Sequence, residues 1–207
     1  MGALIGTLLI LFLPSNKNAT TTTTHPPIIS LLRSNDPIFA LYNTTAGDST
    51  GGFDGIYSPN PTERTPSAID GNLNTKYVNG GPSVSQTNNS LYRGIDSGFF
   101  ITPTIHFGTI AVGFRFGVAN DVPLRDPLSI TLEGTNSTAL NTSSVWTLIY
   151  SGPTGIDLNP NVTRLTYGAL QNFSNTIAYQ SYRLLVTAKR GDSSWVQYSE
   201  FELWGYY

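Results

Sequence analysis

Apolar residues alternate with polar ones in short stretches along the second half of the chain, and turn residues separate these stretches. Ile110, Val112, Phe114 and Phe116 occupy every second position of one stretch. A period of two places such side chains on one face of a β-strand. Thirteen Pro are spread over the 207 residues, and Pro breaks long helices. The pattern predicts an all-β fold built from short strands, typical of a β-sandwich.

Composition excludes several classes of protein. The chain has no Cys, which rules out disulfides, thiolate metal sites and a Cys nucleophile. Its 11 Lys and Arg residues are scattered and the net charge is −2, which argues against a nucleic acid partner. Neither a phosphate-binding loop nor a nucleophile elbow is present, so we expect no nucleotide ligand and no catalytic residue. A binding or structural protein is favoured over an enzyme.

The N-terminus carries an apolar run from Ala3 to Leu13. The run is too short for a membrane-spanning helix, which needs about 20 residues, but it suits the apolar region of a secretory signal. No basic residue precedes it, so the tail of a truncated membrane anchor is the alternative. Residues 1–15 are therefore interpreted as a signal peptide or an anchor. Both interpretations predict an extracellular protein that is secreted or tethered to the cell surface.

Two segments follow before the main domain. Residues 16–27 include an unbroken row of Thr from Thr20 to Thr24 and then His25-Pro26-Pro27, a composition typical of a glycosylated stalk. Residues 28–49 are apolar and strand-like. This extension is expected either to add a strand to its own sandwich or to pair with the edge of a neighbouring copy. The folded domain itself is predicted over residues 50–207.

The sequence contains seven N-x-S/T sequons, which are acceptors for N-linked glycans in secreted proteins. Chance is the alternative explanation, since Asn, Ser and Thr are abundant here. The candidate glycosylation sites are Asn18, Asn43, Asn88, Asn136, Asn141, Asn161 and Asn172.

Three blocks carry a family resemblance. Residues 68–77 (AIDGNLNTKY) resemble the A-x-D-G-x-x-x-T-x-[WY] segment of galactose-binding-like domains. Residues 116–127 (FGVANDVPLRDP) resemble the AND-x-P-x-RDP stretch of one extracellular branch, and residues 196–205 (VQYSEFELWG) complete the pattern. The superfamily includes discoidin or coagulation-factor type C domains and family 32 carbohydrate-binding modules. The resemblance implies a jelly-roll sandwich of about eight antiparallel strands.

The resemblance also implies a structural calcium site. In similar domains the loop after the first residue of this block, Ala68 here, supplies oxygen ligands. A Glu near the C-terminus completes the set of ligands around the calcium ion. Carried over by position, the side-chain ligands are Asp70, Thr75 and Glu200, and the carbonyl ligands are Ser67, Asn72 and Ser199. The alternative is an Asx turn in which Asp70 caps its own loop without a metal.

A sugar site needs an exposed aromatic ring and polar groups for hydroxyls. Trp195 is the best aromatic candidate, Tyr77 is a second, and Asp121, Arg125 and Arg190 are the polar candidates. An ion pair of Arg125 with Asp121 or Asp126 is an alternative explanation for that group. The sequence thus predicts a non-catalytic glycan-binding module whose partners are glycans or extracellular glycoproteins. The alternative is a structural glycoprotein that assembles with copies of itself through the strand-like extension.

Overall fold

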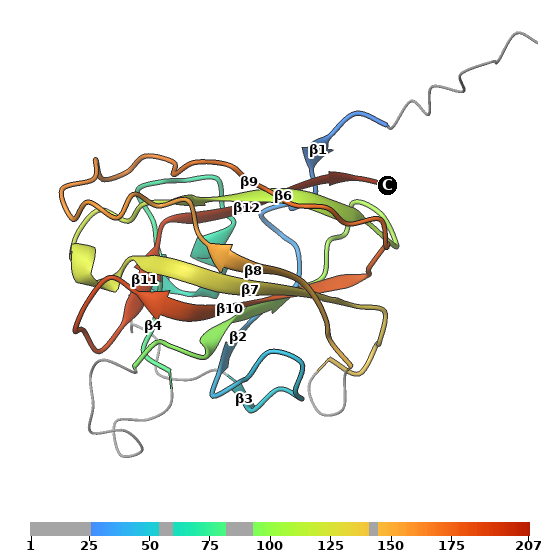
Figure 1. Cartoon of the computed structure of the whole chain (residues 1–207), viewed down its shortest axis with the longest axis horizontal. Helices are drawn as coiled ribbons and strands as arrows, with labels where there is room; N and C mark the ends of the chain where they lie inside the picture. The colour runs from blue at the N-terminus through green and yellow to red at the C-terminus, as the bar shows by residue number, and fades with distance from the viewer. Residues whose placement is uncertain (1–25, 54–59, 82–92, 141–144) are drawn as a thin grey trace, which may run out of the picture.

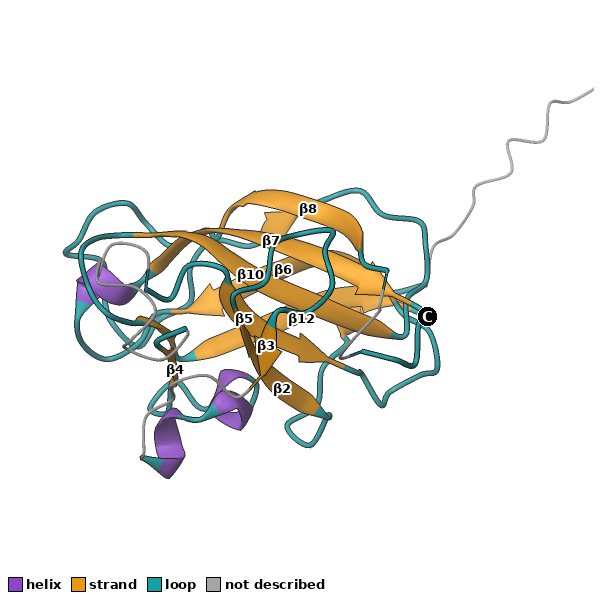
Figure 2. Ribbon diagram, turned by 90° about the horizontal axis from the view of Figure 1, so that it is seen from below, coloured by secondary structure: helices purple, strands orange, loops and turns teal. Residues whose placement is uncertain are grey.

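The computed structural model describes residues 26–53, 60–81, 93–140 and 145–207. Two antiparallel sheets stack face to face around one core (Figures 1 and 2). The six-stranded sheet has the order β3 (Gly52–Phe53), β2 (Ile38–Tyr42), β5 (Ser97–Ile101), β10 (Ser181–Lys189), β7 (Pro127–Thr135) and β8 (Thr147–Pro153). The four-stranded sheet has the order β1 (Ile29–Ser30), β12 (Glu200–Tyr206), β6 (Ile110–Gly117) and β9 (Gln171–Asn172).

A small third sheet closes one end of the sandwich, at the left of Figure 1. It pairs β4 (Tyr77–Asn79) with β11 (Val196–Tyr198). Short 3-10 turns, η1 (Pro61–Glu63), η2 (Thr65–Ala68) and η4 (Pro123–Arg125), are the helical elements that the structure describes. The all-β prediction is therefore confirmed. Within the described ranges, no helix has the length and apolarity needed to cross a membrane.

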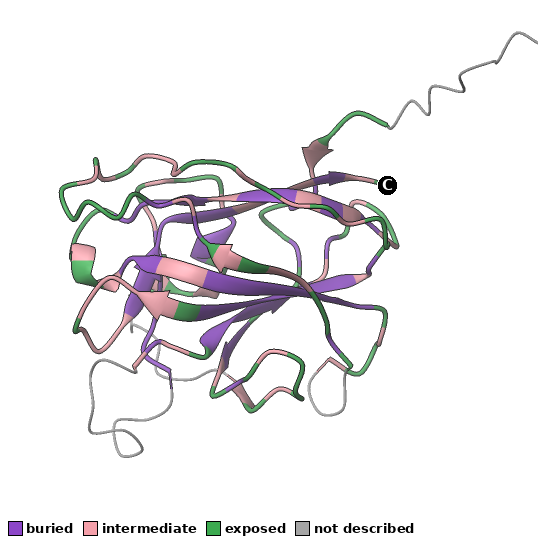
Figure 3. Ribbon diagram, viewed as in Figure 1, coloured by how far each residue is buried: buried purple, intermediate pink, exposed green. Residues whose placement is uncertain are grey.

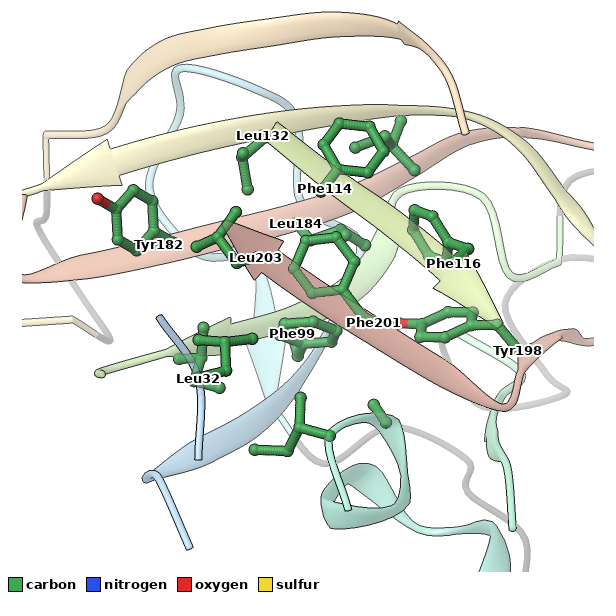
Figure 4. Packing of buried hydrophobic residues seen from close by; sticks show 14 of the residues in the cluster. Leu32, Phe99, Phe114, Phe116, Leu132, Tyr182, Leu184, Tyr198, Phe201 and Leu203 are labelled. Atoms are coloured by element: carbon green, nitrogen blue, oxygen red, sulfur yellow. The ribbon is translucent and has the colours of Figure 1, made fainter. Parts of the chain in front are cut away.

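Aromatic rings fill the space between the two main sheets (Figure 4). Phe116 of β6 lies 5.0 Å from Tyr198 and 5.2 Å from Phe201, measured between ring centroids. Phe99 and Phe114 complete the group, and all five side chains are buried. Such close, tilted packing is the arrangement that aromatic rings prefer, and it anchors β12 across the core. Figure 3 shows the same strands as the buried centre of the molecule.

One predicted strand face is wrong in part. The sequence pattern placed Ile110, Val112, Phe114 and Phe116 on one face of β6, but of these four only Phe114 and Phe116 are buried in the core. Trp204 pairs with Gly113 and Gly205 with Ala111, so Val112 is the extra residue of a β-bulge in β6. A bulge inserts one extra residue and reverses the alternation beyond it. Ile110 and Val112 are therefore turned to the outer surface.

The segment predicted as an extension outside the domain supplies strands to it. Ile29 of β1 pairs with Gly205 of β12, and β2 pairs along β5 from Ile38 to Leu41. Leu31 and Leu41 are fully buried. The predicted boundary at residue 50 is thus corrected to about the start of β1. Residues 1–15 and most of the stalk, up to residue 25, lie outside the described residues.

The loop after β2 lies over the outer face of the six-stranded sheet. Beneath it Arg183 donates through Nε to Glu133 Oε2 at 2.7 Å, and both side chains are fully buried. Two other groups of this pair hold the loop: Gly47 N–H donates to Glu133 Oε1 at 2.6 Å, and Arg183 Nη1 donates to the Asp48 carbonyl at 3.0 Å. Arg183 also stacks over the ring of Trp146 at 4.6 Å. The ion pair therefore fastens this loop onto the sheet.

Four of the predicted glycosylation sites are described, and the side chains of all four are exposed: Asn43, Asn136, Asn161 and Asn172. Asn18, Asn88 and Asn141 lie outside the described residues.

Candidate functional site

The loop after η2 folds around the side chain of Asp70. Asn72 N–H donates to Asp70 Oδ1 at 2.9 Å, which forms an Asx turn, and Gly71 adopts φ +76° within it. Thr75 Oγ1 lies 2.7 Å and 2.9 Å from the two carboxylate oxygens of Asp70 and 2.8 Å from the Asn72 carbonyl oxygen. Three of the predicted calcium ligands are therefore gathered in one turn.

Glu200, the first residue of β12, reaches the same turn. Its Oε1 accepts hydrogen bonds from Gly71 N–H at 2.8 Å and Asn72 N–H at 3.1 Å. Burial, which is the largest cause, and the neighbouring Asp70 carboxylate together raise the pKa of Glu200 to about 8, against the opposing effect of the two N–H donors. A proton on Glu200 or a bound cation would relieve the repulsion between the two carboxylates.

The donor set of this turn fits a calcium ion. Calcium takes six to eight oxygen ligands, including carboxylates, hydroxyls and carbonyls, and Asp70, Thr75, Asn72 and Glu200 offer all three kinds. Ser67 lies in η2, which contacts β12, and Ser199 directly precedes Glu200. Among the described residues, no cluster joins three or more Asp, Glu or His side chains. A metal held here would therefore depend on carbonyl and hydroxyl ligands as well as the two carboxylates.

A hollow of about 240 Å³ opens beside the two carboxylates. It runs between the chain after β1, the Asp70 turn and the edge of β12. Arg33, Asp70 and Glu200 are among its lining residues. The carboxylate pair is thus reachable from one side, as a cation site requires.

Lys76 connects this turn to a second polar group on the loop after β6. Its Nζ donates to Asp121 Oδ1 at 2.7 Å and to Asn120 Oδ1 at 3.0 Å. Gln197 Nε2 donates to Asp121 Oδ1 at 2.9 Å. Partial burial acts to raise the pKa of Asp121, but the hydrogen bonds from Lys76 and Gln197 lower it on balance. Asp121 is therefore a fixed, ionised carboxylate, with 48% of its side chain exposed.

Arg125 stands on the other side of Gln197. Its Nη1 lies 3.5 Å from Gln197 Oε1, and its Nε donates to Ser193 Oγ at 3.2 Å. Trp195 lies two residues before Gln197 and is half-buried, whereas Gln197 is fully buried. The structure therefore brings Asp121 and Arg125 together through Gln197, with Trp195 next to Gln197 on the same segment.

Two predicted ligand residues lie inside the fold. Tyr77 is fully buried, and its hydroxyl donates to the Gly98 carbonyl at 2.9 Å. Arg190 is 6% exposed and donates to Asp126 and to the carbonyls of Pro123 and Leu158. The expectation that either side chain contacts a sugar is corrected, because Tyr77 is buried in the core and Arg190 is held by Asp126 and backbone carbonyls.

Asp126 is also held differently from the ion pair that the sequence suggested. Arg164 donates to both of its carboxylate oxygens, at 2.6 Å and 2.8 Å, and Arg190 donates at 3.2 Å. Asp126 is fully buried, whereas Arg125 bonds to Ser193 instead. Arg164 lies outside every recognised block, so no sequence signal pointed to it. Gln197 lies inside the last block, but its type alone did not reveal its role.

Comparisons with known proteins find similarity at the level of structure. No family model matches the chain, and no curated protein matches its sequence. A family 32 carbohydrate-binding module from Clostridium perfringens, in complex with GalNAc-β-1,3-galactose, superposes with a TM-score of 0.53 at 11% identity, covering 84% of this chain and 99% of that chain. The family 32 module of NanJ from the same organism, in complex with galactose, gives 0.52 at 12% identity, covering 86% and 99%.

A third match is the pair of family 32 modules of Clostridium perfringens ZmpB in complex with GalNAc. Its TM-score is 0.54 at 16% identity, and the match covers 85% of this chain and 36% of that chain. This chain has the galactose-binding-like fold. The predicted jelly-roll sandwich is confirmed with it, and the neighbours that share this fold are carbohydrate-binding modules.

Proposed function

We propose that this protein is an extracellular, non-catalytic glycan-binding module. The observation that carries the proposal is that Gln197 links Asp121 and Arg125 beneath the surface, with the half-buried Trp195 two residues before it in the chain. The galactose-binding-like fold supports it, because the solved neighbours are modules bound to galactose or GalNAc. Sugars of the galactose configuration are therefore the first ligands to test.

The chemistry of this surface suits neutral sugars. Asp121 offers a carboxylate that accepts hydrogen bonds from hydroxyl groups, and Arg125 offers a guanidinium that donates them. Trp195 supplies an aromatic ring for the apolar face of a sugar ring. Lys76 and Gln197 fix the position of Asp121. A preorganised carboxylate loses little conformational entropy when a ligand binds.

A structural calcium ion is the second part of the proposal. Asp70, Thr75 and Glu200 would hold it with their side chains, and Ser67, Asn72 and Ser199 with their carbonyls. Bound calcium neutralises the two carboxylates and so stabilises the turn. Lys76 follows Thr75 directly and holds Asp121, so order in the turn supports order at the ligand surface. In this way the metal would assist binding without contacting the sugar.

The alternative of self-assembly through segment 28–49 loses its main support. The strands of that segment, β1 and β2, pair within their own chain.

The proposal is tested by a glycan array in calcium-containing buffer, followed by titration calorimetry on any sugar that binds. Asp121→Ala and Trp195→Ala should each weaken binding by about tenfold or more, which is the effect expected of a contact residue. Leu158→Ala is the matched control, since Leu158 is 74% exposed on a neighbouring loop. Absence of binding across the array, or equal losses in all three variants, would contradict the proposed site.

A further inference from the structure

An open groove of about 610 Å³ lies on the outer face of the four-stranded sheet, away from the Asp121 surface. Its size is within the range of ligand sites, which is roughly 300–1,000 Å³. Its lining combines apolar and aromatic side chains with polar ones. The lining residues are Ile28, Val112, Asn172, Phe173, Ser174, Asn175, Thr176 and Tyr206.

The bulge in β6 creates this groove. It turns Val112 to the outside and places Gly113 between Asn172 of β9 and Trp204 of β12. A Cβ atom at position 113 would lie 3.1 Å from Asn172 Oδ1 and 3.1 Å from the Gln171 carbonyl. Glycine therefore leaves room beside the Asn172 amide.

The rim of the groove is fixed by hydrogen bonds to the sheet. Phe173 N–H donates to the Val112 carbonyl at 3.0 Å, and Asn175 Nδ2 donates to the Ala111 carbonyl at 3.2 Å. Asn175 also bonds to Ile177 through its side chain, at 3.0 Å in both directions. The groove is therefore preformed, although Ile28 on its wall is 60% exposed.

Asn172 lines this groove and heads the sequon Asn172-Phe173-Ser174. Its side chain is exposed and makes no hydrogen bond to any described residue. Asn136 differs, because its amide donates to the Ala178 carbonyl and accepts from Gln180 N–H. A sugar chain attached to Asn172 would begin inside the groove, so its local concentration there would be high.

We propose that Asn172 carries an N-linked glycan whose first sugars occupy this groove and cover Ile28, Val112 and Tyr206. In the modification, Asn172 Nδ2 loses a proton and bonds to the anomeric carbon of an oligosaccharide. The bond from that carbon to its lipid-linked diphosphate donor breaks, and the diphosphate keeps the electron pair. The rings of Phe173 and Tyr206 suit the apolar face of a sugar. The proposal rests on the extracellular location within the proposed function.

The test is secretion of the full chain from a eukaryotic cell line, with glycopeptide mass spectrometry on the purified protein. We expect Asn172 to be modified. N172Q and S174A both remove this sequon, and S174A keeps the Asn side chain. Each should lower the thermal midpoint by about 2–4 °C and speed amide exchange in residues 110–113. N161Q is the matched control on a loop remote from the groove, and S174T keeps the sequon; neither should change these values.

The outcomes separate this proposal from the proposed function. An unmodified Asn172 beside a modified Asn161 overturns the groove assignment alone. Absence of glycan at both positions in the secreted protein overturns the groove assignment, whereas failure of the full chain to reach the medium contradicts the extracellular location. Asn172 can also prove to be modified while loss of its glycan in N172Q and S174A leaves the thermal midpoint and the exchange rates unchanged. That result would show that the glycan lies outside the groove, which also overturns the proposal. The glycan array result for the Asp121 surface does not enter this test.

Discussion

Gly71 N–H donates a 2.8 Å hydrogen bond to Glu200 Oε1, although the two residues are 129 positions apart. The same oxygen accepts a second bond from Asn72. One buried carboxylate at the start of the last strand therefore holds the turn that follows η2.

Glu200→Ala should detach this turn. The substitution leaves Gly71 N–H without its acceptor, while Asn72 N–H keeps its bond to Asp70 Oδ1, so the expected cost is about 1–3 kcal/mol in the free energy of unfolding. Urea denaturation measures the change. Glu202→Gln, two residues along the same strand and partly exposed, should cost less than about 1 kcal/mol. Equal losses in the two variants would show that the Glu200 bonds do not stabilise the fold.

Stability of the metal-free protein should fall between about pH 5 and pH 8. Glu200 has a pKa of about 8 in the fold against an ordinary value of 4.5, so the folded state binds a proton that the unfolded state has released. The unfolding free energy therefore decreases as pH rises through this window. Urea titrations in a chelator at several pH values measure the slope, and Glu200→Gln should flatten it. A slope that Glu200→Gln leaves unchanged would assign the effect to another group.

Calcium should reverse this decline if the Asp70 turn binds it. A cation at this turn would favour the ionised form of Glu200, so the increase in thermal midpoint on adding calcium should be larger at pH 8 than at pH 5. Differential scanning calorimetry with calcium, and with magnesium as the matched control, measures this increase. A midpoint that calcium leaves unmoved at both pH values contradicts the metal site.

The ion pair of Arg183 and Glu133 should be sensitive to removal of one partner. Arg183→Met leaves Glu133 charged and fully buried, which typically costs about 3–5 kcal/mol. The double variant Arg183→Met/Glu133→Met should lose less than the single variant, since no uncompensated charge remains. A double-mutant cycle by urea denaturation gives the coupling. Additive losses would indicate that the two side chains act independently.

Asp126→Asn should destabilise the loops beside the proposed ligand site at Asp121 and Arg125. Asp126 neutralises Arg164 and Arg190 in a site that excludes water, so loss of its charge should cost about 3–5 kcal/mol. Thermal denaturation measures the loss, with Asp157→Asn on an exposed neighbouring position as the control. Comparable midpoints for the two variants would argue that the arginines are held by backbone carbonyls alone.

Much of the fold was accessible from the sequence because its signals are local. Alternation gave the strands of the second half, and the block at residues 68–77 predicted the turn that Asp70 and Thr75 form. The bulge at Val112 was not accessible, since one extra residue leaves the apolar composition unchanged. The role of segment 28–49 was left open, because strand partners are chosen by contacts far away in the sequence.

The sequence predicted the candidate site only where a motif indicates both which residue takes part and what its side chain does. Tyr77 matches the aromatic position of its block, but the block does not say that the ring is buried. Arg125 and Asp126 are adjacent in sequence and invite an ion pair, yet the strand direction after η4 sends their side chains to different partners. Arg164 could not be found, because a lone Arg in a loop carries no information about which carboxylate it meets.

The pairing of β1 with β12 also sets the order in which the molecule can form during synthesis. Ile29 pairs with Gly205, and β12 lies between β1 and β6 in the four-stranded sheet. This sheet therefore cannot close until the last strand has left the ribosome. Until then Phe114 and Phe116 lack the ring of Phe201, against which both pack in the finished core. Completion of the core between the two sheets therefore waits for β12.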